Sequence, residues 1–192
     1  MDKIIQFFPS SFYLAENLMD EHSVLKLQNK SLQIQSQGNK GGDNWLCDTY
    51  NTLGAYDLGQ DKDFKPLLDT IEDKVFEFTK AHNSNHKYPI KESWLNIYKE
   101  KDYQEYHYHA DCTFSAVYFL KSNKNCAKIF FENPAEPDMK PIKEITGQNK
   151  LTFKNCHFIP VQNSLLIFRS YMRHMVEKQK TDFERITIAV NL

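Results

Sequence analysis

The chain has 192 residues, of which 41% are hydrophobic and 26% charged, and its formal net charge is −1. This composition excludes an intrinsically disordered chain and is sufficient for one domain, residues 1–192, with a substantial core. The near-neutral balance gives no strong nucleic-acid signal, and no run is long and apolar enough to cross a membrane. The N-terminus lacks a signal-peptide pattern and the four cysteines include no close pair. We therefore expect reduced thiols and a cytoplasmic protein, of host or viral origin.

The first 90 residues are predicted to form a helical N-terminal support. Ile4–Tyr13 has the composition of an edge strand, and the apolar spacing in Tyr13–Gln28 predicts a helix. Ser36–Asp43 (SQGNKGGD) is a loop by composition. Lys62–Ala81 has the clearest helical pattern, with Pro66 in its first turn, where a missing N–H costs nothing. We expect this second helix to buttress one side of a sheet.

Residues 91–192 contain short runs rich in β-branched and aromatic residues, separated by turn clusters such as SNKN and NPAEPDMKP. The runs are SWLNIYK, YQEYHYH, FSAVYFLK, AKIFFEN, KLTFK, CHFIPV, SLLIFRS, RHMVEK and RITIAVNL. Several short strands at this spacing predict a sandwich or a small barrel. The expected fold class is therefore mainly β with N-terminal helices (α+β), in which the helices pack on a C-terminal β-barrel core.

Three potential metal ligands, His107, His109 and Asp111, stand at alternate positions, and His174 follows far downstream. Alternate residues of an extended chain point to the same face. Positions 107 and 111 lie about 13 Å apart at roughly 3.3 Å per residue, too far to serve one ion, whereas either adjacent pair can do so. Two histidines and one carboxylate form the facial ligand set of non-haem Fe(II) oxygenases. We therefore expect His109, Asp111 and His174 to bind iron, and a site built on the His107–His109 pair is the alternative.

Arginine is used sparingly and in one place. Of the 24 Lys and Arg residues only three are arginines, and Arg169, Arg173 and Arg185 all lie near His174. Arginine suits planar, bidentate binding of a carboxylate. Arg185 follows His174 by 11 residues, enough for a strand, a turn and a returning strand, and Thr187 shares its face. We expect Arg185 to hold the far carboxylate of a dicarboxylate whose keto-acid end chelates iron, and we interpret Arg169 and Arg173 as surface residues.

Three segments carry a family resemblance: KESWLNIYKEKDYQEYHYHADCTFSAVYFLK, SLLIFRSYMRH and ERITIAVNL. Through them the chain resembles the phage-type 2-oxoglutarate/Fe(II) oxygenases, relatives of the prolyl hydroxylases with a double-stranded β-helix (jelly-roll) core. FFPSSFY, NKGGDNW and DFKPLLDTIEDKV occur in the same order as in that family. The resemblance implies a dioxygenase that hydroxylates a substrate with Fe(II), 2-oxoglutarate and O2, releasing succinate and carbon dioxide. It also implies that Tyr118, Asn96 and Tyr98 donate hydrogen bonds to the 2-oxoglutarate carboxylates.

The chain departs from the family pattern beside the first histidines. Family members usually read H-x-H-P, where this chain has Ala110 after His109, and their residue matching Asp111 is often not an acid. The His107–His109 pairing therefore stays open as the alternative ligand pair.

Three other functions compete with the oxygenase. The H-x-H-x-D run also begins the metallo-β-lactamase signature, but Cys112 stands where that signature needs a histidine. A cupin shares the barrel and the H-x-H pair, but it has a Glu soon afterwards, and none occurs between Asp111 and Phe131. A catalytically inactive binding module of the same fold is the third alternative. The partner is expected to be an unidentified substrate, such as a peptide or a small molecule, and the chain a monomer or homodimer.

Overall fold

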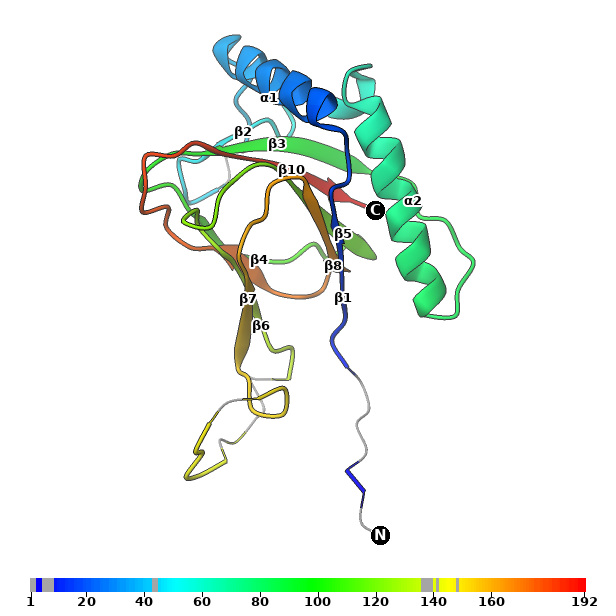
Figure 1. Ribbon diagram of the computed structural model, residues 1–192, viewed down its shortest axis with the longest axis vertical. Helices are drawn as coiled ribbons and strands as arrows, with labels where there is room; N and C mark the ends of the chain where they lie inside the picture. Colours follow the sequence, from blue (N-terminus) through cyan, green and yellow to red (C-terminus); the bar gives the residue numbers. More distant parts are fainter. Residues whose placement is uncertain (1–2, 5–8, 43–44, 136–139, 141, 148) are drawn as a thin grey trace.

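The computed structural model describes residues 3–4, 9–42, 45–135, 140, 142–147 and 149–192 (Figure 1). In this part of the chain no helix is long and apolar enough to cross a membrane. In chain order the elements are β1 (Phe12–Glu16), α1 (Glu21–Ser36), β2 (Tyr50–Asn51), the 3-10 helix η1 (Leu58–Gln60), α2 (Lys65–Ala81), β3 (Glu92–Tyr98), β4 (Gln104–His107), β5 (Phe114–Lys121), β6 (Ile129–Glu132), β7 (Asn155–Phe158), β8 (Ser164–Arg169), β9 (His174–Val176) and β10 (Arg185–Asn191).

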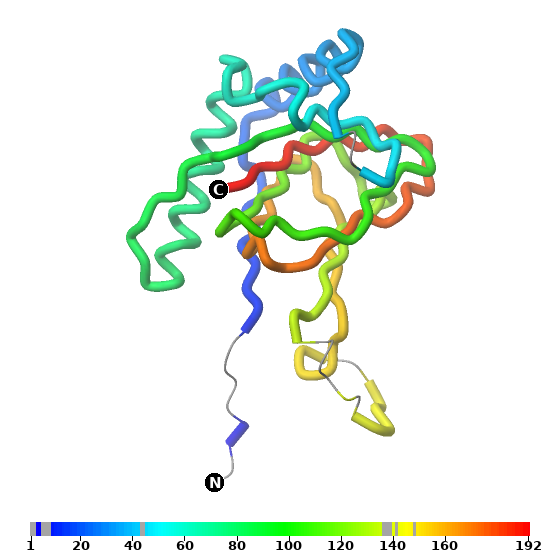
Figure 2. Tube along the Cα trace, turned by 180° about the vertical axis from the view of Figure 1, so that it is seen from behind, coloured from blue at the N-terminus to red at the C-terminus, as the bar shows by residue number. Residues whose placement is uncertain are grey.

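The strands form two antiparallel sheets that face each other as a barrel (Figures 1 and 2). The larger sheet has the order β1-β8-β5-β10-β3-β2, and the smaller one has the order β4-β9-β6-β7. From β3 to β10 the chain passes repeatedly between them, with β3, β5, β8 and β10 in the larger sheet and the other four strands in the smaller. This is the arrangement of a double-stranded β-helix, and it confirms the predicted mainly β fold with N-terminal helices.

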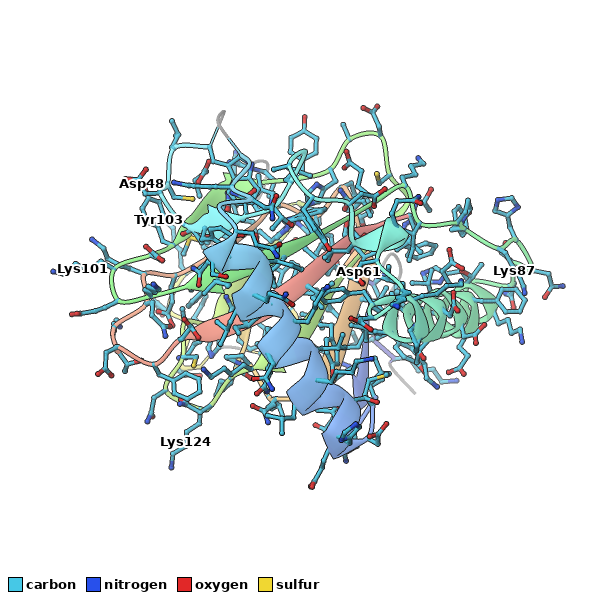
Figure 3. All side chains as sticks on the ribbon, turned by 90° about the horizontal axis from the view of Figure 1, so that it is seen from above. Asp48, Asp61, Lys87, Lys101, Tyr103 and Lys124 are labelled. Atoms are coloured by element: carbon cyan, nitrogen blue, oxygen red, sulfur yellow. The ribbon has the colours of Figure 1, made fainter. Side chains whose placement is uncertain are left out.

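The central strands of the larger sheet present different side chains to its two faces, as extended chains must. On the outer face α1 and α2 cover an apolar core (Figures 1 and 3). Its buried members include Leu27, Ile71, Leu95, Tyr118 and Ile188. The inner face, toward the smaller sheet, carries the alternate residues of the same strands, which lie between these core residues in the sequence. The helices therefore bury one face of the sheet and leave the other to line the barrel.

The helix predicted for Tyr13–Gln28 is wrong in its first part. Phe12–Glu16 is a strand at the edge of the larger sheet, where it pairs with β8. The helix begins only at Glu21, because the Asp20 side chain accepts a hydrogen bond from the backbone N–H of Ser23 and caps it there. Pairing with a strand far away in the sequence thus overrides a local helical spacing.

The other predicted elements agree more closely with the structure. α2 ends at Ala81 as predicted and begins at Lys65, three residues later than predicted, with Pro66 in its first turn. Residues 37–42 are irregular as expected. Residues 5–8 and 43 lie outside the described part, so the predicted edge strand and loop are compared only over their remaining residues. The run KLTFK, residues 150–154, forms turns instead of a strand.

Candidate metal centre

Three histidine side chains meet between the two sheets. His107 is the last residue of β4, His174 is the first of β9, and the two are register partners across this strand pair. Their ring centroids lie 4.2 Å apart. The His109 centroid lies 5.1 Å from that of His107 and 5.4 Å from that of His174. One nitrogen of each ring lies within 4.8 Å of the others, so small side-chain adjustments bring all three onto one metal ion.

The chain turns after His107 instead of continuing as a strand, and this turn decides which groups meet. The backbone N–H of His109 donates to the Ser170 carbonyl at 3.0 Å, and that of Cys112 donates back to the His109 carbonyl at 3.4 Å. Asp111 lies in this turn, is exposed, and is not part of the histidine cluster that the described residues form. The extended spacing behind the Asp111 expectation therefore does not hold beyond His107. The structure brings together the alternative pair, His107 and His109.

Backbone carbonyls orient two of the three imidazole rings. Nδ1 of His107 lies 2.8 Å from the carbonyl oxygen of Glu105, and Nδ1 of His174 lies 2.9 Å from that of Met172. Because a carbonyl only accepts, each Nδ1 carries the proton and donates it, which leaves the Nε2 lone pair free for a metal. Such a bond to the second ring nitrogen is the usual support of a metal-binding histidine.

Burial keeps the three imidazoles in their neutral form. His174 is only 4% exposed, and burial, together with the nearby His107, holds its pKa well below the usual value. Burial, and to a smaller extent the neighbouring His107, lowers the pKa of His109 to about 4. Burial lowers the pKa of His107 as well. Neutral imidazoles present lone pairs, so protons do not compete with a metal at neutral pH.

The metal-free protein is expected to lose stability as the pH falls below about 6.5, the usual pKa of histidine. In this range the histidines of the unfolded chain bind protons, whereas those of the folded chain do not, so protonation stabilises the unfolded state. The free energy of unfolding therefore falls with pH until about pH 4, where His109 of the folded protein also binds a proton. For His109 alone the loss amounts to about 3 kcal/mol. Urea unfolding between pH 7 and pH 4 measures it. The variant His109→Gln should show a weaker pH dependence, and equal slopes for both proteins would contradict this explanation.

A cavity extends from the histidines along the inner faces of β3 and β10. The empty space along its lining, counted together with the open solvent at its mouth, is about 470 Å³, of which about 40 Å³ can hold the centre of a water-sized molecule. Alternate residues of the two strands line it as register partners, namely Tyr98 with Arg185, Asn96 with Thr187, and Trp94 with Ala189. Among the described residues that line this cavity there is no Asp or Glu, and Arg185 carries a formal positive charge. The cavity therefore favours an anion.

The Arg185 guanidinium is buried without a full set of hydrogen-bond partners. It is 1% exposed, and its Nε and Nη1 have no partner in the described structure. The guanidinium carbon lies 4.5 Å from the centroid of the Tyr98 ring and 5.5 Å from that of Phe119, as in cation–π contacts. Burial lowers the pKa of Arg185, but a guanidinium remains protonated in proteins. A buried cation with unpaired donors is costly unless an anion meets it, so an anion in this cavity would relieve the cost of burying Arg185.

Two further unpaired polar atoms belong to the lining of the same cavity. Trp94 Nε1 and Asn96 Oδ1 are buried and have no hydrogen-bond partner in the part of the chain that the structure describes. Asn96 Nδ2 donates to the Thr187 hydroxyl at 3.4 Å, and the Trp94 ring centroid lies 5.9 Å from that of His109. Asn96 and Thr187 were expected in the site, whereas Trp94 was not. The alternation of Trp94, Asn96 and Tyr98 in SWLNIYK was the signal that could have identified it.

Tyr118 and two of the arginines lie elsewhere. Tyr118 packs in the core beneath the helices, and its hydroxyl donates to Asn163 Oδ1 at 2.8 Å. Because alternate residues of β5 face opposite sides of the sheet, this placement does not support the expectation that Tyr118 binds the co-substrate. Arg173 forms an ion pair with Glu132 at 3.2 Å, and Arg169 Nε donates to a backbone carbonyl at 3.3 Å. Neither arginine lines the cavity.

Comparisons with known proteins agree with this geometry. Residues 92–191 match the family model described as "Putative 2OG-Fe(II) oxygenase". Among solved structures, the chain is similar to a Pseudomonas putida prolyl-4-hydroxylase, with 12% identity, 95% of this chain and 92% of that chain covered, and a TM-score of 0.67. It is also similar to the viral collagen prolyl hydroxylase of Paramecium Bursaria Chlorella virus-1, with 14% identity, 94% of each chain covered and a TM-score of 0.61.

A third similar structure is the non-haem alpha-ketoglutarate-dependent epimerase SnoN from nogalamycin biosynthesis, with 10% identity, 95% of this chain and 78% of that chain covered, and a TM-score of 0.70. At these identities the likenesses establish the double-stranded β-helix fold. The comparison with curated proteins gave no match to this chain.

Proposed function

Because this chain belongs to the 2OG-Fe(II) oxygenase family, whose model matches residues 92–191, we propose that it is a dioxygenase that hydroxylates its substrate with Fe(II), 2-oxoglutarate and O2. One observation carries this proposal. A single cavity joins three neutral histidines, His107, His109 and His174, to a buried arginine, Arg185, two of whose donor nitrogens lack partners in the described structure. Three imidazoles suit a divalent metal, and the guanidinium suits a carboxylate.

His107, His109 and His174 are the proposed iron ligands. This set differs from two histidines and one carboxylate, because Asp111 lies in the exposed turn outside the cluster. Three neutral ligands leave the charge of the ion to be balanced by whatever binds beside it. A dianionic co-substrate supplies this balance in a cavity that offers no acidic side chain among its described lining residues.

The unpaired polar atoms of the cavity match 2-oxoglutarate. Nε and Nη1 of Arg185 each have a donor free for a carboxylate oxygen, and the Thr187 hydroxyl on the same face of β10 is a further donor. Trp94 Nε1 offers another donor on the side of the cavity near His109. A dicarboxylate thus relieves the cost of donors that are otherwise buried without a partner.

The residues of the chain hold and orient the reactants. When bound, the iron supplies the oxidative chemistry, in which 2-oxoglutarate and O2 give succinate and carbon dioxide and one oxygen atom enters a C–H bond of the substrate. The carbonyls of Glu105 and Met172 keep Nε2 of His107 and His174 unprotonated and aimed at the cluster. The aromatic surroundings of Arg185 exclude water and thereby strengthen its ion pair with a carboxylate.

The purified protein is expected to bind one Fe(II) and to convert 2-oxoglutarate to succinate slowly even without a substrate. Anaerobic metal titration gives the stoichiometry, and mass spectrometry after exposure to air measures succinate. His174→Ala serves as the control and should abolish both, since it removes a proposed ligand. Zinc that resists chelation, with no binding of 2-oxoglutarate, would contradict the proposal. Binding of iron and 2-oxoglutarate with no succinate under any condition would indicate an inactive binding module instead.

We propose a cytoplasmic setting and a peptide or small-molecule substrate. Support for a reducing environment comes from the cysteines, since Cys47, Cys112, Cys126 and Cys156 are all free thiols. A pull-down or a metabolite screen with the iron-replaced, 2-oxoglutarate-loaded protein would identify the substrate class, because it holds the site in the state that receives the substrate.

A further inference from the structure

His109 is supported differently from the other two histidines of the cluster. Nδ1 of His107 and of His174 each faces a backbone carbonyl, which can only accept a hydrogen bond. Nδ1 of His109 instead faces the side-chain amide of Asn191, whose Nδ2 lies 3.2 Å away. An amide can present a donor or an acceptor to the same position, depending on which way it is turned. The backbone therefore does not determine which nitrogen of the His109 ring carries the proton.

The observed orientation of the Asn191 amide suits the metal-free state. Nδ2 of Asn191 donates to Nδ1 of His109, so Nδ1 is unprotonated and the ring proton resides on Nε2, which Asn191 does not contact. A metal bound at Nε2 needs the other tautomer, with the proton on Nδ1 and an acceptor opposite it. That acceptor is available when the amide turns by about 180° and places Oδ1 beside the ring.

The surroundings of Asn191 can satisfy both orientations. Ser115 Oγ lies 2.9 Å from Asn191 Oδ1 and 2.8 Å from Ser170 Oγ, and all three residues are buried. In the observed orientation Ser115 donates to Oδ1 and accepts from Ser170. After the turn Nδ2 donates to Ser115, and Ser115 donates to Ser170, because hydroxyl protons rotate freely. Neither state leaves a buried partner of this chain unpaired.

Glu92 favours the metal-free orientation. Its Oε2 accepts from Asn191 Nδ2 at 3.3 Å in the observed state, and its side chain is exposed. When the amide turns, Glu92 loses the hydrogen bond from Asn191, but water can solvate its exposed carboxylate. The turn therefore leaves no buried charge without a partner. Only the side-chain amide turns. The backbone of Asn191 stays in place because it is part of β10, where Asn191 pairs with Glu92 of β3 and with Ser115 of β5.

We propose that Asn191 is a positioning residue that sets the tautomer of His109, donating to Nδ1 in the metal-free protein and accepting from Nδ1–H when His109 binds a metal. This inference rests on the proposed role of His109 as a metal ligand. In the metal-bound state the amide of Asn191 accepts a hydrogen bond from Nδ1 of His109, as the carbonyls of Glu105 and Met172 accept one from His107 and His174.

The first test observes the tautomer directly, by long-range ¹H–¹⁵N NMR of the histidine ring nitrogens, with His109→Gln to assign the signals. In the wild-type protein the proton of His109 is expected on Nε2 without metal and on Nδ1 when Zn(II) is bound. A proton on Nδ1 in both states would overturn the proposed turn of the amide.

The second test compares Zn(II) affinity, by competition with a chelator, in three variants. Asn191→Leu removes both donor and acceptor and should weaken binding about 10- to 100-fold, the usual effect of losing such a support. Asn191→Asp keeps an acceptor beside Nδ1 and should stay within about fivefold of the wild type, below that range. Ser93→Ala, a buried position next to Glu92 in β3 and outside this network, is the matched control and should bind as the wild type does.

The outcomes separate the two proposals. A wild-type protein that binds Zn(II) while Asn191→Leu binds equally well contradicts only the role of Asn191. A wild-type protein that binds no metal contradicts the proposed function itself. If Asn191→Leu does not fold, as thermal unfolding would show, the wild-type NMR experiment and the Asn191→Asp affinity still decide the inference.

Discussion

Replacing Arg185 by alanine is expected to weaken 2-oxoglutarate binding by more than a hundredfold. The guanidinium is buried between Tyr98 and Phe119, so the carboxylate that it meets would be left without a partner in surroundings that water does not reach. Losing one member of a buried ion pair typically costs about 3–5 kcal/mol, and about 1.4 kcal/mol corresponds to a factor of ten in affinity. Calorimetry on the anaerobic, metal-loaded protein measures the change.

Three variants test whether this effect belongs to the guanidinium of Arg185. Arg185→Lys should recover only part of the affinity, because an ammonium cannot make the two parallel hydrogen bonds. Arg169→Ala and Arg173→Ala should stay within about tenfold of the wild type, as expected of partly exposed interactions, because neither residue lines the cavity. Metal affinity should change little in Arg185→Ala. If Arg185→Ala bound 2-oxoglutarate normally while another arginine variant did not, the assignment of the carboxylate position would be wrong.

Replacing His107 by alanine is expected to weaken metal binding by more than a hundredfold, more than the 10- to 100-fold loss that a supporting residue typically gives. His107 is the register partner of His174, and its Nε2 is held unprotonated by the carbonyl of Glu105. Without it two imidazoles remain, and the cavity has no carboxylate among its described lining residues to replace the lost ligand. Cobalt(II) absorption with a competing chelator measures the affinity of each variant.

Asp111→Ala is the matched control for His107→Ala, since it removes the other candidate ligand near His109. Asp111 is exposed in the turn after β4, and its backbone carbonyl, not its carboxylate, accepts the hydrogen bond from Lys91. Its loss should therefore change metal affinity by less than about threefold, as for an exposed charge that forms no ion pair with the other described residues. The opposite order of effects, with Asp111→Ala the more damaging variant, would return Asp111 to the ligand set and exclude the three-histidine site.

The fold class and several site residues could be predicted because short stretches of sequence encode them. Alternation in runs such as RITIAVNL reports which residues share a face of a strand, and it predicted that Thr187 lies beside Arg185, as both do in the lining of the cavity. Asn96, which lines the same cavity, was implied by the family resemblance. The choice of arginine in a chain that otherwise uses lysine pointed to Arg185 for a similar local reason, since the chemistry of the side chain is a property of the residue itself.

Other features depended on contacts between distant parts of the chain. The strand at Phe12–Glu16 forms because it pairs with β8, although its own spacing suggests a helix. The family resemblance suggested Tyr118 as a co-substrate donor, but the structure places Tyr118 in the core beneath the helices. Alternation relates neighbours to one another and does not say which face of β5 the helices cover.

By itself the sequence determined that the chain is mainly β with N-terminal helices, and that an H-x-H run, a distal histidine and Arg185 are candidate site residues, since periodicity and residue chemistry are local properties. The double-stranded β-helix was implied by the family resemblance. Only the tertiary structure decided that His107 and not Asp111 lies with His109 and His174. The reason is that β4 ends at His107, where the Ser170 carbonyl, far away in the sequence, takes the N–H of His109 and turns the chain. A hydrogen bond between distant segments sets the direction of the following residues, and no spacing rule for an extended strand contains it.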